Sequence, residues 1–266
     1  MQPFDLEQGK LSVRVSEGVY YQLLADIEEF NFKKTNGNKN SNAFFNKLLP
    51  NLISFRFEKR KDLRDFLENN FKHCIKDNFK NKVFDIMDDL FDTVYFDDYR
   101  ENYHRHILHF RLNKTNIIEL QSFFDDLNNQ NQNKTSYLRN LFNEYANMRK
   151  DKRESVCFSE EIALLNNAVK NKLLISCSYN NDYYNLIPFT IDLNYIDDSL
   201  YLLALESKRT NICHTFKISS IRNITIKTPY EFKFDNTTLE KLKHIIYKYD
   251  YTNKDTLNLK LLKHIY

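Results

Sequence analysis

The stretch Lys10-Leu-Ser-Val-Arg-Val-Ser16 alternates polar and apolar residues, which is the period of a β-strand that buries one face. The same alternation returns at Leu108-His-Phe-Arg-Leu-Asn113. The apolar side chains are Leu11, Val13 and Val15 in the first stretch and Leu108, Phe110 and Leu112 in the second. We therefore expect two equivalent short strands, each with a buried face and a polar outward face.

The same elements follow each strand. Ser16 and Asn113 are typical helix N-caps, because their side-chain oxygens can accept from an early helical N–H. Apolar residues then recur at helical spacing: Tyr20, Leu23, Ile27 and Phe30 in the first repeat, and Ile117, Leu120, Phe124 and Leu127 in the second. After a polar break comes a second helix, with the apolar pairs Phe44/Phe45 and Leu48/Leu49 matched by Tyr137/Leu138 and Leu141/Phe142. Strand, helix, turn and helix therefore occur twice.

This arrangement resembles the ribbon-helix-helix family of DNA-binding proteins, in which two copies pair their strands into an antiparallel ribbon. The resemblance implies that outward strand side chains touch base edges. Carried over by position, these are Lys10, Ser12, Arg14, His109 and Arg111. Ile107 departs from the polar pattern, so one side of the ribbon is expected to bind more weakly. The strands pair either within one chain or between two chains, and we expect a homodimer.

Composition narrows the functional classes. The 266 residues suit two domains and carry a net charge of +3. With only 3 Gly, the chain has neither a P-loop nor a dinucleotide-binding glycine motif. The charge is mildly basic and does not by itself indicate a nucleic-acid partner.

The cysteines and the hydropathy indicate a compartment. Cys74, Cys157, Cys177 and Cys213 form no CxxC pair, so we interpret them as reduced residues. No signal peptide is recognisable, and no apolar run approaches the ~20 residues of a membrane span. We expect a cytoplasmic protein without a membrane partner.

A dense basic cluster follows the first repeat. Its members are Arg56, Lys59, Arg60, Lys61 and Arg64. The cluster is either a solvated helix face or a phosphate-contacting patch that flanks the ribbon. For the second interpretation Arg56, Lys59 and Arg60 are the candidate residues.

Two further clusters have the residue types of metal or catalytic sites. The acidic cluster is Asp85, Asp88, Asp89 and Asp92, on the polar face of an amphipathic pattern. Such a pattern favours a helix packed between the two repeats. The histidine cluster is His104, His106 and His109, but strand alternation turns His109 away from the other two. We expect no metal, no cofactor and no catalytic residue, since no base, nucleophile and orienting group fall into a recognisable motif.

The second half begins after Met148-Arg-Lys-Asp-Lys-Arg153, a polar stretch that we interpret as a linker. A helix capped by Ser159 is expected next. Five strands with short polar breaks follow, over 173–179, 183–192, 199–206, 212–218 and 221–227. Five short strands that meander in this way are expected to close into a small barrel.

This half resembles the WYL domain. The segments that carry the resemblance are Leu173-Leu-Ile-Ser-Cys-Ser-Tyr179, Ile187-Pro-Phe189, Leu200-Tyr-Leu202 and His214-Thr-Phe-Lys-Ile218. The family implies an SH3-like or Sm-like barrel of a bacterial regulator, which binds nucleic acid or a nucleotide-type ligand through a basic and aromatic surface. The expected ligand surface is Tyr179, Tyr201, His214, Phe216, Lys217 and Arg222. The family is named after a Trp-Tyr-Leu triplet, for which this chain has Leu200-Tyr201-Leu202, so the Trp is missing. His214 and Ser220 stand where the family usually has Arg.

The expected fold is therefore α+β. Its parts are a ribbon-helix-helix-like unit (1–55), a helical connector (56–103), a second such unit (104–150), the barrel (151–228) and a short C-terminal α/β extension (229–266).

The function that we expect is non-enzymatic regulation through nucleic-acid binding. One form is a transcriptional regulator on duplex DNA. The other is suggested by a resemblance to the WYL accessory proteins of type VI CRISPR systems, which bind single-stranded RNA and stimulate an RNA-guided nuclease. An RNA-guided nuclease is therefore a possible partner class. The alternative is a protein-interaction scaffold whose ribbon only dimerises.

Overall fold

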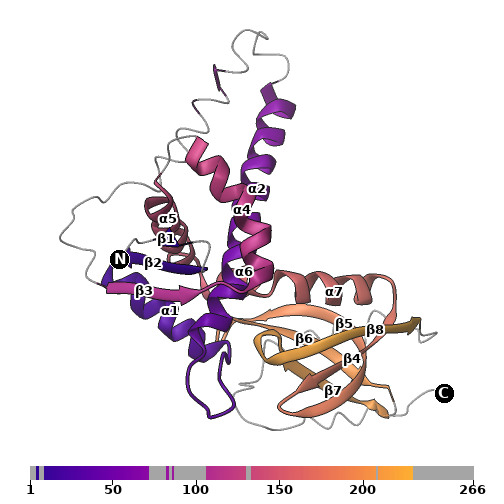
Figure 1. The fold of residues 1–266 in the computed structure, drawn as a ribbon. Helices are drawn as coiled ribbons and strands as arrows, with labels where there is room; N and C mark the ends of the chain where they lie inside the picture. Colours follow the sequence, from indigo (N-terminus) through magenta and orange to yellow (C-terminus); the bar gives the residue numbers. More distant parts are fainter. Residues whose placement is uncertain are drawn as a thin grey trace. The chain divides into compact units, whose positions relative to one another are not determined.

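The computed structural model describes residues 4–5, 9–71, 82–83, 86, 106–129, 133–207 and 209–229. The chain divides into two compact units, residues 1–148 and 149–266, and each is described by itself (Figure 1). The predicted aspartate-rich helix face, His104, Cys74 and the extension after residue 229 lie outside the described residues.

A ribbon of two antiparallel strands is the centre of unit 1. Strand β2 (Lys10–Val15) pairs with β3 (His106–Arg111), and the short β1 (Phe4–Asp5) pairs with the start of β2. The predicted alternation is confirmed. The apolar residues Leu11, Val13, Val15, Leu108 and Phe110 are buried, whereas Lys10, Arg14, Ile107, His109 and Arg111 are exposed. The ribbon forms within one chain.

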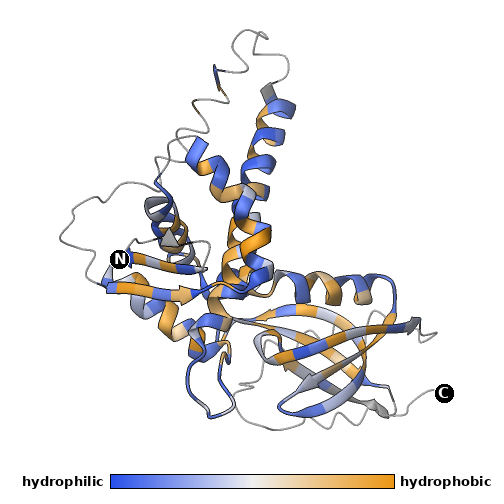
Figure 2. Cartoon of the chain, viewed as in Figure 1, coloured by the Kyte–Doolittle hydropathy of each residue, from blue (hydrophilic) through white to orange (hydrophobic). Residues whose placement is uncertain are grey.

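Four helices complete the two repeats. They are α1 (Glu17–Glu29), α2 (Ser41–Phe71), α4 (Lys114–Asn129) and α5 (Lys134–Ala146). Asn113 caps α4, accepting from the N–H of Asn116 at 2.8 Å, whereas Ser16 precedes α1 without a side-chain cap. The expected boundary at residue 55 falls within α2, which continues unbroken to Phe71. Its first half is largely hydrophobic and its last turns are largely hydrophilic (Figure 2).

The two repeats are interlocked. The register places Ser12 opposite His109, and these residues also hold the same position in the two repeats. A pseudo-twofold axis therefore passes through this pair. The second helix of each repeat contacts the strand of the other: Asn46 Nδ2 donates to Arg111 O at 2.7 Å, and Arg139 Nε donates to Arg14 O at 2.8 Å. Neither repeat can bury its apolar face without the other.

Aromatic side chains fill the space under the ribbon. The Phe45 ring stacks on that of Phe110 with centroids 4.4 Å apart, and Phe142 meets Phe45 edge-on at 5.6 Å. Such pairs are worth about 0.5–1.5 kcal/mol beyond the area that they bury. These rings pack α2 and α5 against β3 under the ribbon, and the polar face of the ribbon is left outward.

Unit 2 is a five-stranded antiparallel sheet preceded by two helices. The helices are α6 (Lys150–Cys157) and α7 (Ser159–Lys170). The strands are β4 (Leu173–Tyr179), β5 (Asp182–Asn194), β6 (Ser199–Glu206), β7 (Arg209–Lys217) and β8 (Ile221–Pro229). Their order is β7-β6-β5-β4-β8, and the 3₁₀ turn η2 (Ile218–Ser220) precedes β8. The five predicted strands are confirmed, but among the described residues β7 and β8 do not pair, so the sheet is not closed.

The chain divides between Met148 and Arg149, at the start of the expected linker, and helix α6 begins at Lys150 within it. Several of the polar residues of α6 are buried: Glu154 is 0% exposed and Arg153 is 8% exposed. The carboxylate of Glu154 accepts from the N–H of Leu200 at 2.7 Å and from the N–H of Ser219 at 3.0 Å. A charged residue therefore joins α6 to the sheet where an apolar pattern would be expected. Ser159, the predicted cap of the next helix, is the first residue of α7.

None of the helices in the described part of the chain combines the length and the hydrophobicity of a membrane span.

Candidate nucleic-acid interface

The residues predicted to contact base edges lie on the outward face of the β2–β3 ribbon. Its cross-strand pairs are Lys10/Arg111, Ser12/His109 and Arg14/Ile107. Alternation puts all six side chains on the side away from the helices. The face is cationic at the Lys10/Arg111 end, mixed at the other end and polar in the middle.

The middle of this face is a hydrogen-bonded pair. Ser12 Oγ and His109 Nδ1 lie 2.9 Å apart, across the pseudo-twofold axis. Which atom donates depends on the imidazole tautomer. His109 is exposed, so its other ring nitrogen can donate to or accept from a base edge or a phosphate.

The Lys10/Arg111 pair brings two positive charges together. The backbone N–H of Arg111 donates to Asn42 Oδ1 at 3.1 Å, and its carbonyl accepts from Asn46. Because both backbone groups of Arg111 point toward α2, Lys10 and Arg111 form a closely spaced pair of the non-hydrogen-bonded type. Like charges directly opposite each other destabilise a ribbon. A bound anion would relieve that repulsion.

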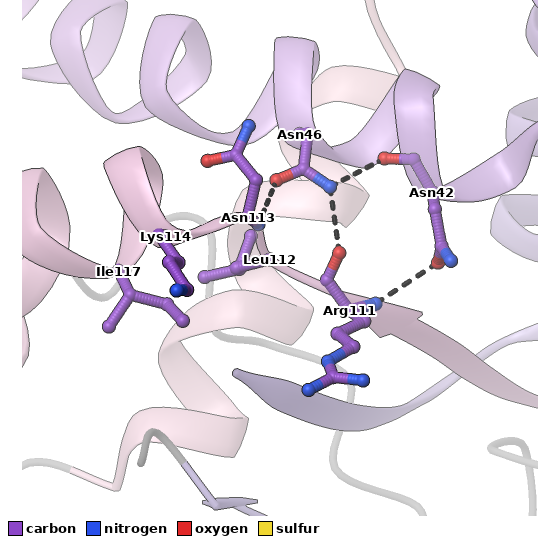
Figure 3. Close-up of a pocket in the computed structure, with 7 residues that line it drawn as sticks. All are labelled: Asn42, Asn46, Arg111, Leu112, Asn113, Lys114 and Ile117. Atoms are coloured by element: carbon purple, nitrogen blue, oxygen red, sulfur yellow. Dashed lines mark hydrogen bonds between the residues drawn. The ribbon is translucent and has the colours of Figure 1, made fainter. Parts of the chain in front are cut away.

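A pocket of about 420 Å³ adjoins this end of the ribbon (Figure 3). Its walls come from the start of α2, the end of β3 and the first turns of α4, including Asn42, Asn46, Arg111, Leu112, Lys114 and Ile117. Figure 3 shows the side chain of Lys114 beside Leu112 and Ile117, with Arg111 on the opposite side of Leu112.

Gly9 makes this arrangement possible. It lies before β2 with φ +65°, and a Cβ at this position would lie 2.7 Å from Ile117 Cδ1 and 2.9 Å from Leu112 O. Its carbonyl accepts from the N–H of Leu112 at 2.8 Å. The close approach of Gly9 to the β3–α4 junction therefore fixes the position of the pocket wall relative to Lys10.

The predicted basic patch on α2 requires a correction. Arg56 is buried, with only 2% exposed. Its Nη1 lies 3.6 Å from Glu144 Oε2, and Lys59 Nζ lies 3.2 Å from Glu144 Oε1. Arg60 is half-buried in the same helix. Arg56 therefore neutralises a buried carboxylate, and it cannot reach a phosphate from this position.

The predicted ligand surface of unit 2 is also partly buried. Tyr201 is 4% exposed and Phe216 is 2% exposed. The hydroxyl of Tyr201 donates to Asp197 Oδ2 at 2.9 Å, and burial raises the pKa of this hydroxyl. Tyr179 is half-buried and meets Phe216 edge-on at 5.1 Å. The aromatic residues Tyr201 and Phe216 thus belong to the core and offer no free face to a base.

The positive groups of that surface have partners within unit 2. Lys217 Nζ lies 3.9 Å from Asp197 Oδ2, and His214 Nε2 lies 3.8 Å from Glu206 Oε2. Arg222 donates to the carbonyls of Ser219 and Ile221, and burial lowers its pKa. These three groups are therefore engaged in contacts inside unit 2 and do not form a bare cationic surface.

Sequence reasoning missed the residues around the pocket. Lys114, Asn42 and Asn46 line the pocket and were not among the predicted site residues. A comparison of the two repeats could have pointed to Lys114, since it occupies the position that Glu17 has in the first repeat. Among the residues that the structure describes, no three His, Cys, Asp or Glu side chains gather as metal ligands.

Comparisons with known proteins give a fold likeness. No family model matches the chain, and no curated protein matches it significantly. One similar solved structure is a crystal structure of a CRISPR Cas-related protein. It matches with a TM-score of 0.67 and 13% sequence identity, over 92% of this chain and 71% of that one. At this identity the likeness shows the fold alone.

Proposed function

We propose that this chain is a non-enzymatic nucleic-acid-binding protein that uses the outward face of the β2–β3 ribbon. The observation that carries the proposal is the ribbon itself: two strands from two repeats, paired antiparallel, with Lys10, Arg14 and Arg111 exposed on one face. Cationic side chains on such a ribbon suit a polyanion, and the ribbon-helix-helix likeness supports base contact in a groove.

We further propose that the protein is an accessory factor of a CRISPR system. The fold likeness to a CRISPR Cas-related protein supports this role. The WYL-like order of segments in unit 2 supports it as well. On this proposal unit 1 holds the nucleic acid. Unit 2, whose predicted ligand residues are mostly engaged in internal contacts, serves to contact an RNA-guided nuclease.

The test is a titration of the full chain with labelled single-stranded RNA and with duplex DNA over a series of salt concentrations. The logarithm of the association constant should fall linearly with the logarithm of the salt concentration. The slope should be about −0.7 per neutralised phosphate for a single strand and about −0.9 for duplex DNA. Arg14→Ala combined with Arg111→Ala should weaken binding about 10-fold or more, since two of the three exposed cationic contacts of the ribbon are lost.

The outcomes separate the alternatives. Preference for single-stranded RNA supports the accessory role, and preference for duplex DNA supports a transcriptional regulator. Lack of measurable binding to both ligands at low salt would contradict the proposal and favour a protein-interaction scaffold. The matched control is Lys34→Ala with Lys61→Ala, which removes two exposed charges that lie outside the ribbon.

A further inference from the structure

The pseudo-twofold axis allows the two ends of the ribbon to be compared position by position. Each residue at the Lys10/Arg111 end has a counterpart at the Arg14/Ile107 end. The counterparts are Lys10 and Ile107, Arg111 and Arg14, Lys114 and Glu17, Asn46 and Arg139, and Ile117 and Tyr20. The shared contacts of Asn46 and Arg139 with the opposite strand support this correspondence.

The Lys10/Arg111 end is rich in cationic side chains, and Asp5 of β1 is the partner of Lys10 in the register on the other side. Lys10, Arg111 and Lys114 bring three positive charges, all exposed, and the pocket lining contains no carboxylate. In the described part of the chain neither Lys10 nor Lys114 forms an ion pair. Leu112 and Ile117 supply an apolar wall between the charges. A pocket with donors and an apolar wall suits a phosphate group joined to a sugar.

The side-chain amide of Asn46 is held against the strand by hydrogen bonds, so it does not fill the pocket. Its Nδ2 donates to Asn42 O and Arg111 O, and its Oδ1 accepts from Asn113 N and Asn116 Nδ2. The short side chain therefore stays against the strand. The wall behind the pocket is fixed by these four bonds, so that a ligand meets preformed geometry.

The Arg14/Ile107 end keeps one arginine of the ribbon and differs at the surrounding positions. Arg139, a longer side chain, replaces Asn46 and is itself bonded to the carbonyl of Arg14. Glu17 places a carboxylate where the other end has Lys114, and the apolar Ile107 replaces Lys10. A carboxylate at this position repels a phosphate.

We infer that the pocket beside Lys10, Arg111 and Lys114 is a subsite for one internal phosphate of a nucleic-acid backbone, and that its counterpart at the other end is not. This inference rests on the proposed function. The nucleic acid is then held more tightly at one end of the ribbon than at the other, so the two ends of the protein are not interchangeable for the ligand.

The experiment measures binding of a labelled single-stranded RNA that begins with a 5′-hydroxyl, so that all of its phosphates are internal. Lys114→Met keeps the length of the side chain and removes the charge. It should weaken binding about fivefold and make the salt slope shallower by about 0.7, the share of one phosphate contact. Lys114→Arg should keep the wild-type slope. Lys34→Met, an exposed lysine in the α1–α2 loop, is the matched control.

The counterpart position completes the test. Glu17→Gln should leave the salt slope unchanged, because no phosphate is bound at that end. If Lys114→Met and Lys34→Met weaken binding equally, or if Lys114→Met keeps the slope, the subsite is wrong while the proposed function stands. If the wild type binds no RNA or DNA, the proposed function fails and the subsite fails with it.

Discussion

The guanidinium of Arg56 lies inside unit 1, beside the carboxylate of Glu144. The side chains of both residues are 3% exposed, and the guanidinium also lies 5.1 Å above the ring of Tyr137. Lys59 reaches the same carboxylate from a half-exposed position. Removal of one partner of a buried ion pair is costly because the other charge stays buried without compensation. This pair therefore couples α2 to α5.

We predict that Arg56→Met lowers the free energy of unfolding by about 3 kcal/mol, the lower end of the range for a broken buried pair, because Lys59 still contacts Glu144. The double variant Arg56→Met with Glu144→Leu should regain most of this loss, since it leaves no buried charge. Urea unfolding followed by circular dichroism measures both. Lys61→Met, an exposed neighbour, is the control and should change stability by less than about 0.5 kcal/mol.

A loss below that control value for Arg56→Met would show that the pair does not stabilise unit 1. The salt slope of nucleic-acid binding should not change in Arg56→Met, and a change would restore Arg56 to the interface.

At the scale of elements, helix α6 depends on Glu154. This carboxylate accepts two backbone N–H groups, one from β6 and one from η2, so it fixes the helix to the sheet at two points. Burial raises its pKa above the ordinary value of 4.5, although the two N–H donors and the charge of Lys217 act in the opposite direction. The folded protein therefore keeps this proton to a higher pH than the unfolded chain does.

The pH dependence of stability follows from this difference. The contribution of Glu154 is fully present below pH 4.5 and is lost as the pH rises through the higher folded-state pKa. We predict that Glu154→Gln flattens this decline. It should also be less stable by about 1–3 kcal/mol, because an amide NH₂ cannot accept one of the two N–H groups. Denaturant unfolding across a pH series tests this, and an unchanged pH profile would contradict it.

The sequence predicted those elements in which buried apolar residues recur at a regular spacing along the chain. The alternation of Leu11, Val13 and Val15 defined β2, and the echo at Leu108 and Phe110 defined β3, with buried and exposed faces as expected. Helix α6 could not be found in this way. Three of its buried residues are charged, and the partners of Glu154, Leu200 and Ser219, lie far along the chain.

The strand residues of the candidate site could be predicted from the sequence, whereas the residues around the ribbon could not. Outward positions follow from alternation alone, so Lys10, Arg14 and Arg111 were found. The burial of Arg56 depends on Glu144, a residue of another helix, and no local pattern indicates it. The pocket likewise depends on which strand meets which, because α2, β3 and α4 form it together.

At the scale of the whole molecule, the two repeats of unit 1 supply within one chain what the ribbon-helix-helix likeness predicted from a homodimer. β2 and β3 pair within the chain, and α2 and α5 each contact the strand of the other repeat. The ribbon therefore needs no second copy for its core to be complete.

We predict that the unfolding midpoint is independent of protein concentration. An obligate homodimer gains stability with concentration by mass action, whereas a ribbon made within one chain does not. Thermal unfolding at concentrations about 100-fold apart, with light scattering at each, measures this. A midpoint that rises with concentration would indicate that the strands exchange between chains.

The internal dyad also has an evolutionary consequence. When two identical polypeptides make a symmetric grip, a single altered codon changes both halves at once, and the grip stays matched to a palindrome. Here the halves have separate codons. A lysine can arise at position 114 while a glutamate persists at position 17, and selection can shape the protein toward a target that reads differently in its two directions.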